Sequence, residues 1–332
     1  MALLQPQLAC CMLNRTMRKV VLFVNPFLEQ RRHQRSILES IATLFRSNNL
    51  EVKVQQTFSI RSAGDQAREA IAAGFDTIVV CGGDGTIFDV VQGVAGSDVP
   101  LGIVPMGTGN VLGQNLGLPR NPLEAAQLLL QSRARRIPLG KFTCQRAGHP
   151  KPGSWHFVCV AGLGTHAYLM NAAERWGKRF GGRASYYLAG FDLLVRKQIE
   201  PFEIEFTTKD GETIKRHVCE AIATRVGALN RWRPGGSLED HTLRLAICEA
   251  TTRTGLAIAS FDALARKSSN RKGKGRVQYF DIYQATCRPI PDLEYRASIL
   301  AQADGEVLGA AEATVTMAKE TLNLLWPDSP GR

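Results

Sequence analysis

The stretch TIVVCGGDGT, residues 77–86, decides how the rest of the chain is interpreted. Residues 77–81 form an apolar strand that runs into three glycines around one acid, after which a helical pattern begins. Glycines let the backbone turn sharply and approach a ligand, and their successive N–H groups can form an anion-binding nest. The N-terminus of the following helix adds a partial positive charge. The stretch therefore predicts a phosphate-binding loop more readily than a tight turn that binds nothing.

Asp84 adds a carboxylate to this loop. A carboxylate should repel phosphate unless a metal ion or a ribose hydroxyl lies between the two, so Asp84 points to a magnesium–nucleotide ligand. Thr86 is expected to be the N-cap of the following helix, and Asp89 stands three residues later, as in a capping box with a shorter acid.

The flanking sequence alternates strand and helix. Apolar runs at 19–24, 77–81 and 100–104 and an alternating run at 51–57 are predicted strands, and helical spacing is found at 29–48, 63–73, 86–95 and 121–132. Continuous apolar strands alternating with helices predict an α/β fold with a doubly wound parallel sheet covered on both faces. Ligands of such sheets bind beyond the carboxyl ends of the strands.

A second loop, PMGTGN at residues 105–110, follows the next strand and should lie beside the first. Thr108 and Asn110 could offer a hydroxyl and an amide to a nucleotide. Asn25 and Thr57 end the first two strands on the same edge, although such residues are commonly turn or cap residues.

Strand-like runs separated by turn residues dominate the second half of the chain. We therefore predict a C-terminal domain that is mainly antiparallel β. The expected division is an extension at 1–16, a nucleotide-binding α/β domain at 17–140, a β-rich domain at 141–312, and a final segment at 313–332.

Composition limits the partners. The net charge is +11, from 41 Lys and Arg against 30 Asp and Glu, which favours anionic partners. No stacking pattern or module predicts nucleic-acid binding.

The eight cysteines contain no Cys-x-x-Cys pair, which favours a reducing cytoplasm over a disulfide framework or a zinc site. No apolar stretch has the length of a membrane span. The basic segment 266–276 is either a contact with an anionic membrane surface or a solvated hairpin.

Late in the chain stands Asp304-Gly305-Glu306. Asp-Gly favours a hairpin turn, and the alternative is a carboxylate held over a cleft as a base for a hydroxyl group.

These motifs, in this order, resemble those of the diacylglycerol kinase catalytic-domain family, which includes diacylglycerol, sphingosine and ceramide kinases. The resemblance runs from about residue 19 to 326. Its matching pieces are VNP at 24–26, GGDGT at 82–86, the stretch 101–110 with LGLP at 116–119, Gly162-x-Gly164, and DGE at 304–306.

The resemblance implies a first domain like those of NAD kinase and phosphofructokinase, a β-rich lipid-binding domain, and a final segment that returns to the first domain. It implies a cytoplasmic lipid kinase of phospholipid metabolism, peripheral to the inner face of the membrane, that uses ATP and Mg²⁺ on a lipid alcohol; a homodimer is left open. Glu306 matches the base, with Asp304 beside it and Asp84 acting through magnesium. The candidate nucleotide-binding residues are Asn25, Thr57, Gly82, Gly83, Asp84, Gly85, Thr86, Gly107, Thr108 and Asn110.

The same resemblance implies a structural magnesium site in the loop 237–243. Asp240 would supply a carboxylate, and Ser237 and Thr242 would supply backbone carbonyls. The chain departs from the family pattern here and elsewhere: His241 replaces a Gly, Arg244 an acid, Val111 an Asp, and Phe88-Asp89 an Asn-Glu.

Two other functions stay open. NAD kinase shares the Gly-Gly-Asp-Gly-Thr loop, but the loop at 105–110 resembles the lipid branch. The altered acids at 89, 111 and 244 motivate a non-enzymatic nucleotide or lipid sensor, whereas retention of Asp84 and Glu306 favours an active kinase.

Overall fold

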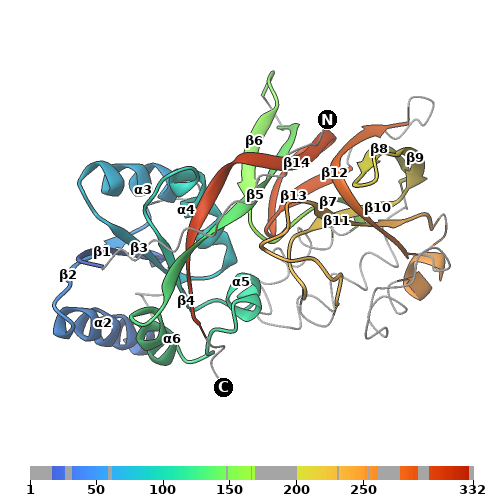
Figure 1. Cartoon of the computed structure of the whole chain (residues 1–332). Coiled ribbons are helices and arrows are strands. Elements are labelled where there is room, and N and C mark those ends of the chain that lie inside the picture. Colours follow the sequence, from blue (N-terminus) through green and yellow to red (C-terminus); the bar gives the residue numbers. More distant parts are fainter. Residues whose placement is uncertain are drawn as a thin grey trace, which may run out of the picture.

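The structure is a computed structural model of the whole chain (Figure 1). It describes residues 17–26, 32–58, 62–146, 149–165, 167–168, 200–229, 232–250, 252, 254–259, 277–290 and 299–328. The extension at 1–16 and the basic segment 266–276 lie outside the described residues.

The N-terminal half is built on four parallel strands. They are β1 (Lys19–Val24), β2 (Glu51–Gln56), β3 (Thr77–Gly82) and β4 (Leu101–Pro105), in the order β2-β1-β3-β4. The helices are α2 (Arg32–Ser47), α3 (Ala63–Ala72), α4 (Asp84–Val94), α5 (Val111–Asn115) and α6 (Pro122–Leu129). This is the α/β arrangement that the apolar strands and helical spacing predict.

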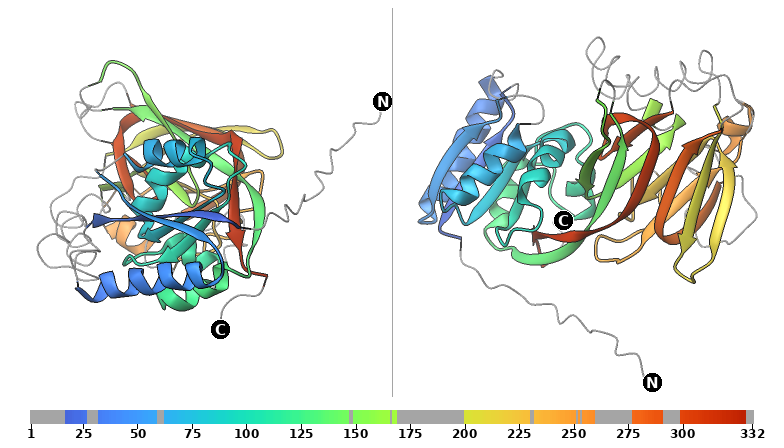
Figure 2. Two further views of the ribbon diagram at one scale, coloured as in Figure 1. Left: turned by 90° about the vertical axis from the view of Figure 1, so that its left-hand side faces the viewer. Right: turned by 90° about the horizontal axis from the view of Figure 1, so that it is seen from above.

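Helices cover both faces of this sheet, with α3 and α4 on one face and α2 and α6 on the other (Figures 1 and 2). The side chains of β1 pack against the helices on both faces. Val21 and Phe23 pack with α3 and α4, whereas Val20, Leu22 and Val24 pack with α2 and α6, and all five are fully buried. A strand that is buried on both faces needs apolar residues at consecutive positions, which explains the unbroken run.

The C-terminal half is an antiparallel sheet that continues from the parallel one. From β14 (Glu306–Trp326) outward, the order is β13 (Leu300–Ala303), β7 (Val160–Gly164), β10 (Glu220–Thr224), β11 (Leu243–Cys248), β12 (Val277–Pro289), β8 (Phe202–Thr208) and β9 (Thr213–Val218). Strand β5 (Arg133–Gln145) pairs with β14 and with β6 (Gly153–Phe157). Alternate residues of β8, Phe202, Ile204 and Phe206, are buried in the core of this half.

Strand β14 links the two halves. Its first part pairs with β13 and β12, and its last part pairs in parallel with β4 through Leu324 and Leu101. Strand β5 runs antiparallel beside it over most of its length, as the red and green ribbons show (Figure 2). Asn323, which is 2% exposed, donates its side-chain amide to the carbonyl of Asp98 at 3.0 Å. The domain limits given above remain a prediction.

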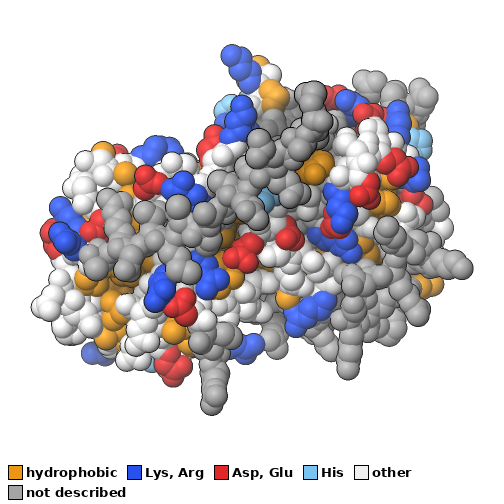
Figure 3. All heavy atoms as spheres, viewed as in Figure 1, with side chains coloured by type: hydrophobic (Ala, Val, Ile, Leu, Met, Phe, Trp, Pro, Cys, Tyr) orange, Lys and Arg blue, Asp and Glu red, His pale blue; other side chains and the backbone are white. Residues whose placement is uncertain are grey.

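The arginines at 133–136 are paired with acids. Arg136 lies 2.6 Å from a carboxylate oxygen of Asp98, and Arg133 and Arg135 lie 3.4 and 3.6 Å from Asp328. In Figure 3, basic and acidic side chains alternate over the visible face. Within the described residues, no helix is long and apolar enough to cross a lipid bilayer.

Leu324→Ala tests the role of β14. Leu324 is fully buried between β4 and β5, so the truncation leaves a cavity and should lower the free energy of unfolding by about 2–5 kcal/mol. Urea denaturation measures the change. Lys319→Ala, on an exposed position of the same strand, is the control and should stay within about 0.5 kcal/mol of the wild type. Equal stability of the two variants would contradict the linking role of β14.

Candidate active site

Parallel pairing brings the predicted loops to one edge of the sheet. Val24, Gln56, Cys81 and Val104 are register partners across neighbouring strands, so the next residue of each strand lies on the same edge. Those next residues are Asn25, Thr57, Gly82 and Pro105. Thr57 is buried and donates its N–H to the carbonyl of Val24 at 3.0 Å.

The two glycine-containing loops touch through their backbones. A Cβ atom on Gly107 would lie 2.6 Å from the Cα atom of Gly83, and a Cβ atom on Gly83 would lie 3.2 Å from the Cα atom of Gly107. The N–H of Met106 also donates to the carbonyl of Gly82 at 2.9 Å. Only glycines allow this approach, so the loops at 82–86 and 106–110 form one continuous backbone surface.

Helix α4 begins two residues earlier than expected. It starts at Asp84 with Gly83 as its N-cap, which makes the prediction of Thr86 as N-cap wrong. Asp89 does not close a capping box, because its carboxylate accepts the N–H of Ala63, at the start of α3, at 3.3 Å. Thr86 instead lies over Gly82, where a Cβ atom would be 3.1 Å from the Thr86 hydroxyl. The glycine loop thus continues directly into the first turn of α4.

Asp84 ties the first loop to the second. Its Oδ1 accepts the N–H of Val111 at 2.8 Å, and a Cβ atom on Gly109 would lie 2.6 Å from its Oδ2. Burial raises the pKa of Asp84 above its ordinary value, against the opposing effect of hydrogen bonds from backbone N–H groups of α5, beginning with Val111. Both oxygens of the Asp84 carboxylate therefore lie against the second loop or the start of α5, which follows it.

Asn110 closes its own loop. Its Oδ1 accepts the N–H of Gly107 at 2.9 Å, its Nδ2 donates to the carbonyl of Gly107 at 2.8 Å, and its φ is +49°. The amide is thus used within the loop, which favours a role in shaping the loop over direct contact with a nucleotide. Thr108, two residues earlier, is exposed at the tip.

The Asp304-Gly305 pair forms the hairpin turn between β13 and β14, with φ values of +46° and +93°. The hairpin interpretation of the sequence is therefore confirmed, and positive φ at both positions is typical of a two-residue turn with the Asp-Gly sequence. Gln302, which is fully buried, accepts the N–H of Gly305 at 2.9 Å.

The Asp304 carboxylate accepts three backbone hydrogen bonds. The donors are the N–H groups of Val158, Cys159 and Val160, at 2.7, 2.8 and 2.8 Å. The N–H of Asp304 returns a bond of 2.7 Å to the carbonyl of Val160. Asp304 therefore clamps the β13–β14 hairpin to the start of β7 and is engaged by the protein itself.

Glu306 begins β14 directly after this turn. Its carboxylate lies so close to Gly85 that a Cβ atom there would overlap its Oε1. A residue of the antiparallel half thus places an acid on the glycine loop of the parallel half, which lies more than 200 positions earlier in the sequence. This contact is the feature that unites the candidate residues in one site.

The loop expected to hold a structural metal is closed on itself. The Asp240 carboxylate accepts the N–H of Ser237 at 3.1 Å, and the Ser237 carbonyl accepts the N–H of Asp240 at 3.3 Å. The described residues contain no cluster of three or more His, Cys, Asp or Glu side chains that could hold a metal ion. The proposed ligands Asp240 and Ser237 are therefore already bonded to each other.

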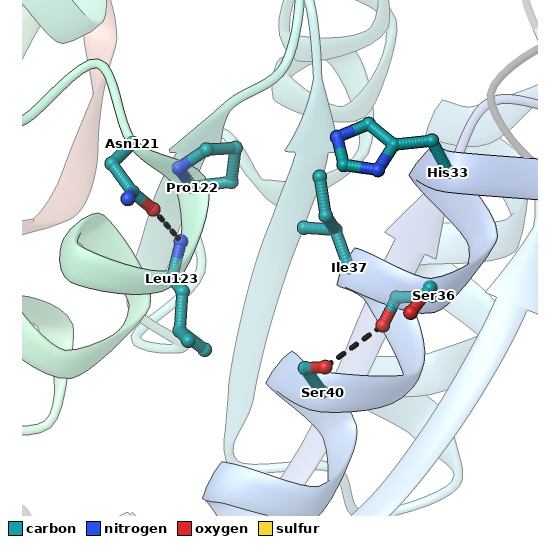
Figure 4. Close-up of a pocket in the computed structure, with 7 residues that line it drawn as sticks. All are labelled: His33, Ser36, Ile37, Ser40, Asn121, Pro122 and Leu123. Atoms are coloured by element: carbon teal, nitrogen blue, oxygen red, sulfur yellow. Dashed lines mark hydrogen bonds between the residues drawn. The ribbon is translucent and has the colours of Figure 1, made fainter.

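A cavity between the first turns of α2 and α6 lies apart from these loops (Figure 4). It is lined by His33, Ser36, Ile37, Ser40, Asn121, Pro122 and Leu123. Asn121 caps α6 by accepting the N–H of Leu123 at 2.9 Å. This lining contains no carboxylate, so the cavity does not offer the acid that the glycine loops have.

Two residues near the site escaped the sequence analysis. They are Arg225 and Gln302, both fully buried although polar. The signal for Arg225 was present, since a charged residue directly follows the apolar strand at 220–224. Gln302 precedes the Asp-Gly turn within a strand of small residues and has no comparable signal.

Asp304 should make stability depend on pH. Burial raises its pKa from 3.8 to about 6, against the effect of the three N–H donors. Because the folded protein binds this proton more tightly than the unfolded chain, the stabilisation is fully present below pH 3.8 and is lost as the pH rises through about 6. We expect the free energy of unfolding of the wild type, relative to Asp304→Asn, to fall by roughly 2–3 kcal/mol over this window.

Urea denaturation of both proteins at several pH values measures this difference. Asn cannot titrate, so the Asp304→Asn variant serves as a reference that keeps every titratable group of the wild type except Asp304. A difference that does not change with pH would show that the Asp304 carboxyl keeps its ordinary pKa.

Comparisons with known proteins agree with this geometry. The diacylglycerol kinase catalytic domain matches residues 19–142. A diacylglycerol kinase of Bacillus subtilis is 31% identical over 216 residues, which cover 63% of this chain and 67% of that enzyme. A diacylglycerol kinase of Mycobacterium tuberculosis is 37% identical over 138 residues, which cover 41% of this chain and 42% of that enzyme.

A crystal structure of a diacylglycerol kinase from Bacillus anthracis shares the fold, with a TM-score of 0.70, 22% identity, and coverage of 95% of this chain and 99% of that one. The order of motifs, their meeting at one edge of the sheet and these similarities lead to one conclusion. The chain belongs to the diacylglycerol kinase family.

Proposed function

We propose that this protein is an ATP-dependent lipid kinase that transfers the γ-phosphate of ATP to a hydroxyl group of a diacylglycerol-like lipid. The observation that carries the proposal is the contact between the Glu306 carboxylate and Gly85. A carboxylate beside a phosphate-binding loop repels a bound phosphate unless it interacts with something else, and the proton of an acceptor hydroxyl is such a partner.

The glycine loops suit the phosphates of ATP. Gly82, Gly83 and Gly85 lie at the end of β3 and the first turn of α4, where unpaired N–H groups and the helix dipole favour negative charge. The neighbouring loop at 106–110 extends the same backbone surface, with the Thr108 hydroxyl at its exposed tip. Asn25 and Thr57 lie on the same edge of the sheet, where we place the rest of the nucleotide.

Glu306 is the proposed catalytic residue. It would accept or orient the proton of the lipid hydroxyl while the hydroxyl oxygen attacks the γ-phosphorus in line and the bond to the β-phosphate oxygen breaks. Phosphoryl transfer depends mainly on positioning and electrostatic stabilisation. Asp304 acts on this step through its three N–H bonds, which hold the turn from which Glu306 projects.

Asp84 is the residue that could hold Mg²⁺. Its Oδ1 accepts the N–H of Val111, and its Oδ2 lies beside Gly109 of the second loop. Nucleotide-bound Mg²⁺ needs only one or two protein carboxylates, because phosphate oxygens and water complete its octahedral shell. Mg²⁺ there would neutralise charge on the phosphates and so remove the conflict between Asp84 and an anionic ligand.

A lipid substrate requires contact with a membrane surface. The net charge of +11 favours an anionic surface at roughly 1 kcal/mol per Lys or Arg that lies close to it. We accordingly propose a cytoplasmic protein that contacts the membrane peripherally.

A direct test uses labelled ATP, Mg²⁺ and mixed micelles that contain diacylglycerol. The wild type should transfer label to the lipid. Glu306→Gln should reduce kcat about 100- to 10,000-fold, because it removes the base without changing the shape of the side chain. Asp84→Asn should also reduce activity, and the effect should appear in the dependence on Mg²⁺ concentration. ATP binding without any labelled lipid would favour the sensor function.

Gly85→Ala tests the contact between the two halves. The added methyl group overlaps the Glu306 carboxylate and must displace it, and a displacement of about 1 Å can lower kcat roughly 100-fold. Gly227→Ala is the control, because a Cβ atom there has no neighbour nearer than 3.5 Å. Equal rates for the two variants in the same micelle assay would mean that Glu306 is not used from this position.

A further inference from the structure

Arg225 is a charged side chain with no exposed surface. It directly follows β10, and its N–H donates to the carbonyl of Cys159 at 2.8 Å. The N–H of the same Cys159 donates to the Asp304 carboxylate at 2.8 Å. A single residue, Cys159, therefore links the backbone of Arg225 to the carboxylate of Asp304, which holds the catalytic hairpin.

The guanidinium of Arg225 binds the loop that was expected to hold a metal. Its Nη2 donates to the carbonyl of Leu238 at 2.5 Å and, over a longer distance of 3.5 Å, to the carbonyl of Asp240. Its Nε and Nη1 have no hydrogen-bond partner in the part of the chain that the structure describes. Two carbonyls of this loop thus accept hydrogen bonds from the positively charged side chain of Arg225.

Burying a charge is costly unless other groups compensate for it. Burial lowers the pKa of Arg225 to about 10, and the negative charges of Asp304 and Asp240 are among the groups that oppose this effect. A guanidinium with a pKa of about 10 is still charged at neutral pH. The positive charge of Arg225 therefore interacts with the charges of two acids, Asp304 on the catalytic hairpin and Asp240 in the loop.

A second arginine secures the same loop from its other end. Arg244 donates through Nε to the carbonyl of Pro234 at 3.3 Å and through Nη1 to Asp281 at 3.0 Å. The centre of its guanidinium group lies 5.6 Å from the centre of the Tyr279 ring. Carbonyls at both ends of the loop thus accept hydrogen bonds from arginines.

We propose that the Arg225 guanidinium, and not a bound divalent metal, is the cation of the loop 234–240, which makes this loop independent of Mg²⁺. The geometry disagrees with the metal site that the sequence suggested at Asp240, Ser237 and Thr242. Asp240 and Ser237 bond to each other, and a divalent ion at this loop would meet a fixed positive charge in a buried environment. This proposal does not concern the Mg²⁺ that we propose at Asp84, because that ion would bind together with the nucleotide.

The first arm of the experiment uses the full-length wild type without nucleotide. After dialysis against EDTA, its metal content is measured by mass spectrometry and its melting temperature is compared with and without added Mg²⁺. We expect no metal that copurifies in a 1:1 ratio and no change in the melting temperature. Retained Mg²⁺ at one ion per chain, with a lower melting temperature in EDTA, would overturn the proposal.

The second arm compares Arg225→Met with Arg225→Lys. Removing the buried guanidinium leaves the carbonyl of Leu238 without its donor and should lower the melting temperature of Arg225→Met by roughly 5–15 °C, and Lys should restore part of it because it keeps the charge. Arg216→Met is the matched control, since Arg216 is half-exposed and pairs with Glu249 at 3.6 Å. If Arg225→Met melted like this control, the guanidinium would not be the cation of the loop.

If Arg225→Met does not fold, the Lys variant and the first arm still decide the question. None of these measurements uses the kinase reaction, so their failure and the failure of the proposed function can be told apart.

Discussion

The site depends on the three hydrogen bonds that the Asp304 carboxylate accepts from consecutive N–H groups of residues 158–160. A charged acceptor engaged by several N–H donors is among the stronger polar contacts in proteins, and it fixes direction as well as distance. It holds the β13–β14 hairpin against β7, and Glu306 then reaches Gly85 because it comes directly after the turn. From the same point β14 runs on into the parallel half, so the contact that orients the acid also starts the strand that joins the two halves.

Charge balance around this contact explains several residues together. Asp84 and Asp304 are both partly buried, and this burial raises the pKa of each, while the charge of Asp84 adds to the effect on Asp304. Backbone N–H groups satisfy one oxygen of Asp84 and both oxygens of Asp304. Arg225 is a fully buried cation whose charge interacts with that of Asp304, and its side chain binds carbonyls of the neighbouring loop. In a region of low dielectric constant, these hydrogen bonds and the nearby positive charge offset the cost of holding several acids close together.

Membership of the diacylglycerol kinase family supports a kinase with an alcohol acceptor for this chain. The family match covers residues 19–142, which supply the glycine loops, whereas Asp304 and Glu306 come from the opposite end of the chain. Of the departures from the family pattern, Val111 lies beside the glycine loop, because its N–H donates to the Asp84 carboxylate. Arg244, which stands in place of an acid, pairs with Asp281 and the loop carbonyl of Pro234, so this change fits a loop held by arginines.

The sequence by itself determined the class of fold, the parallel strands of the first half, the position of the glycine loop after β3 and the Asp-Gly turn. These features depend on local properties: strands buried on both faces need continuous apolar runs, and loops of this shape need glycine. Tertiary structure decided the roles of Asp304, Asn110 and Arg225, and it moved the start of α4 from Thr86 to Asp84. The partners of Asp304 are about 145 positions away, as the pair with Cys159 shows, and the acceptors of Arg225 are 13 and 15 positions away. Local patterns constrain the backbone near each residue, but which distant groups a buried polar side chain meets depends on how the whole sheet packs.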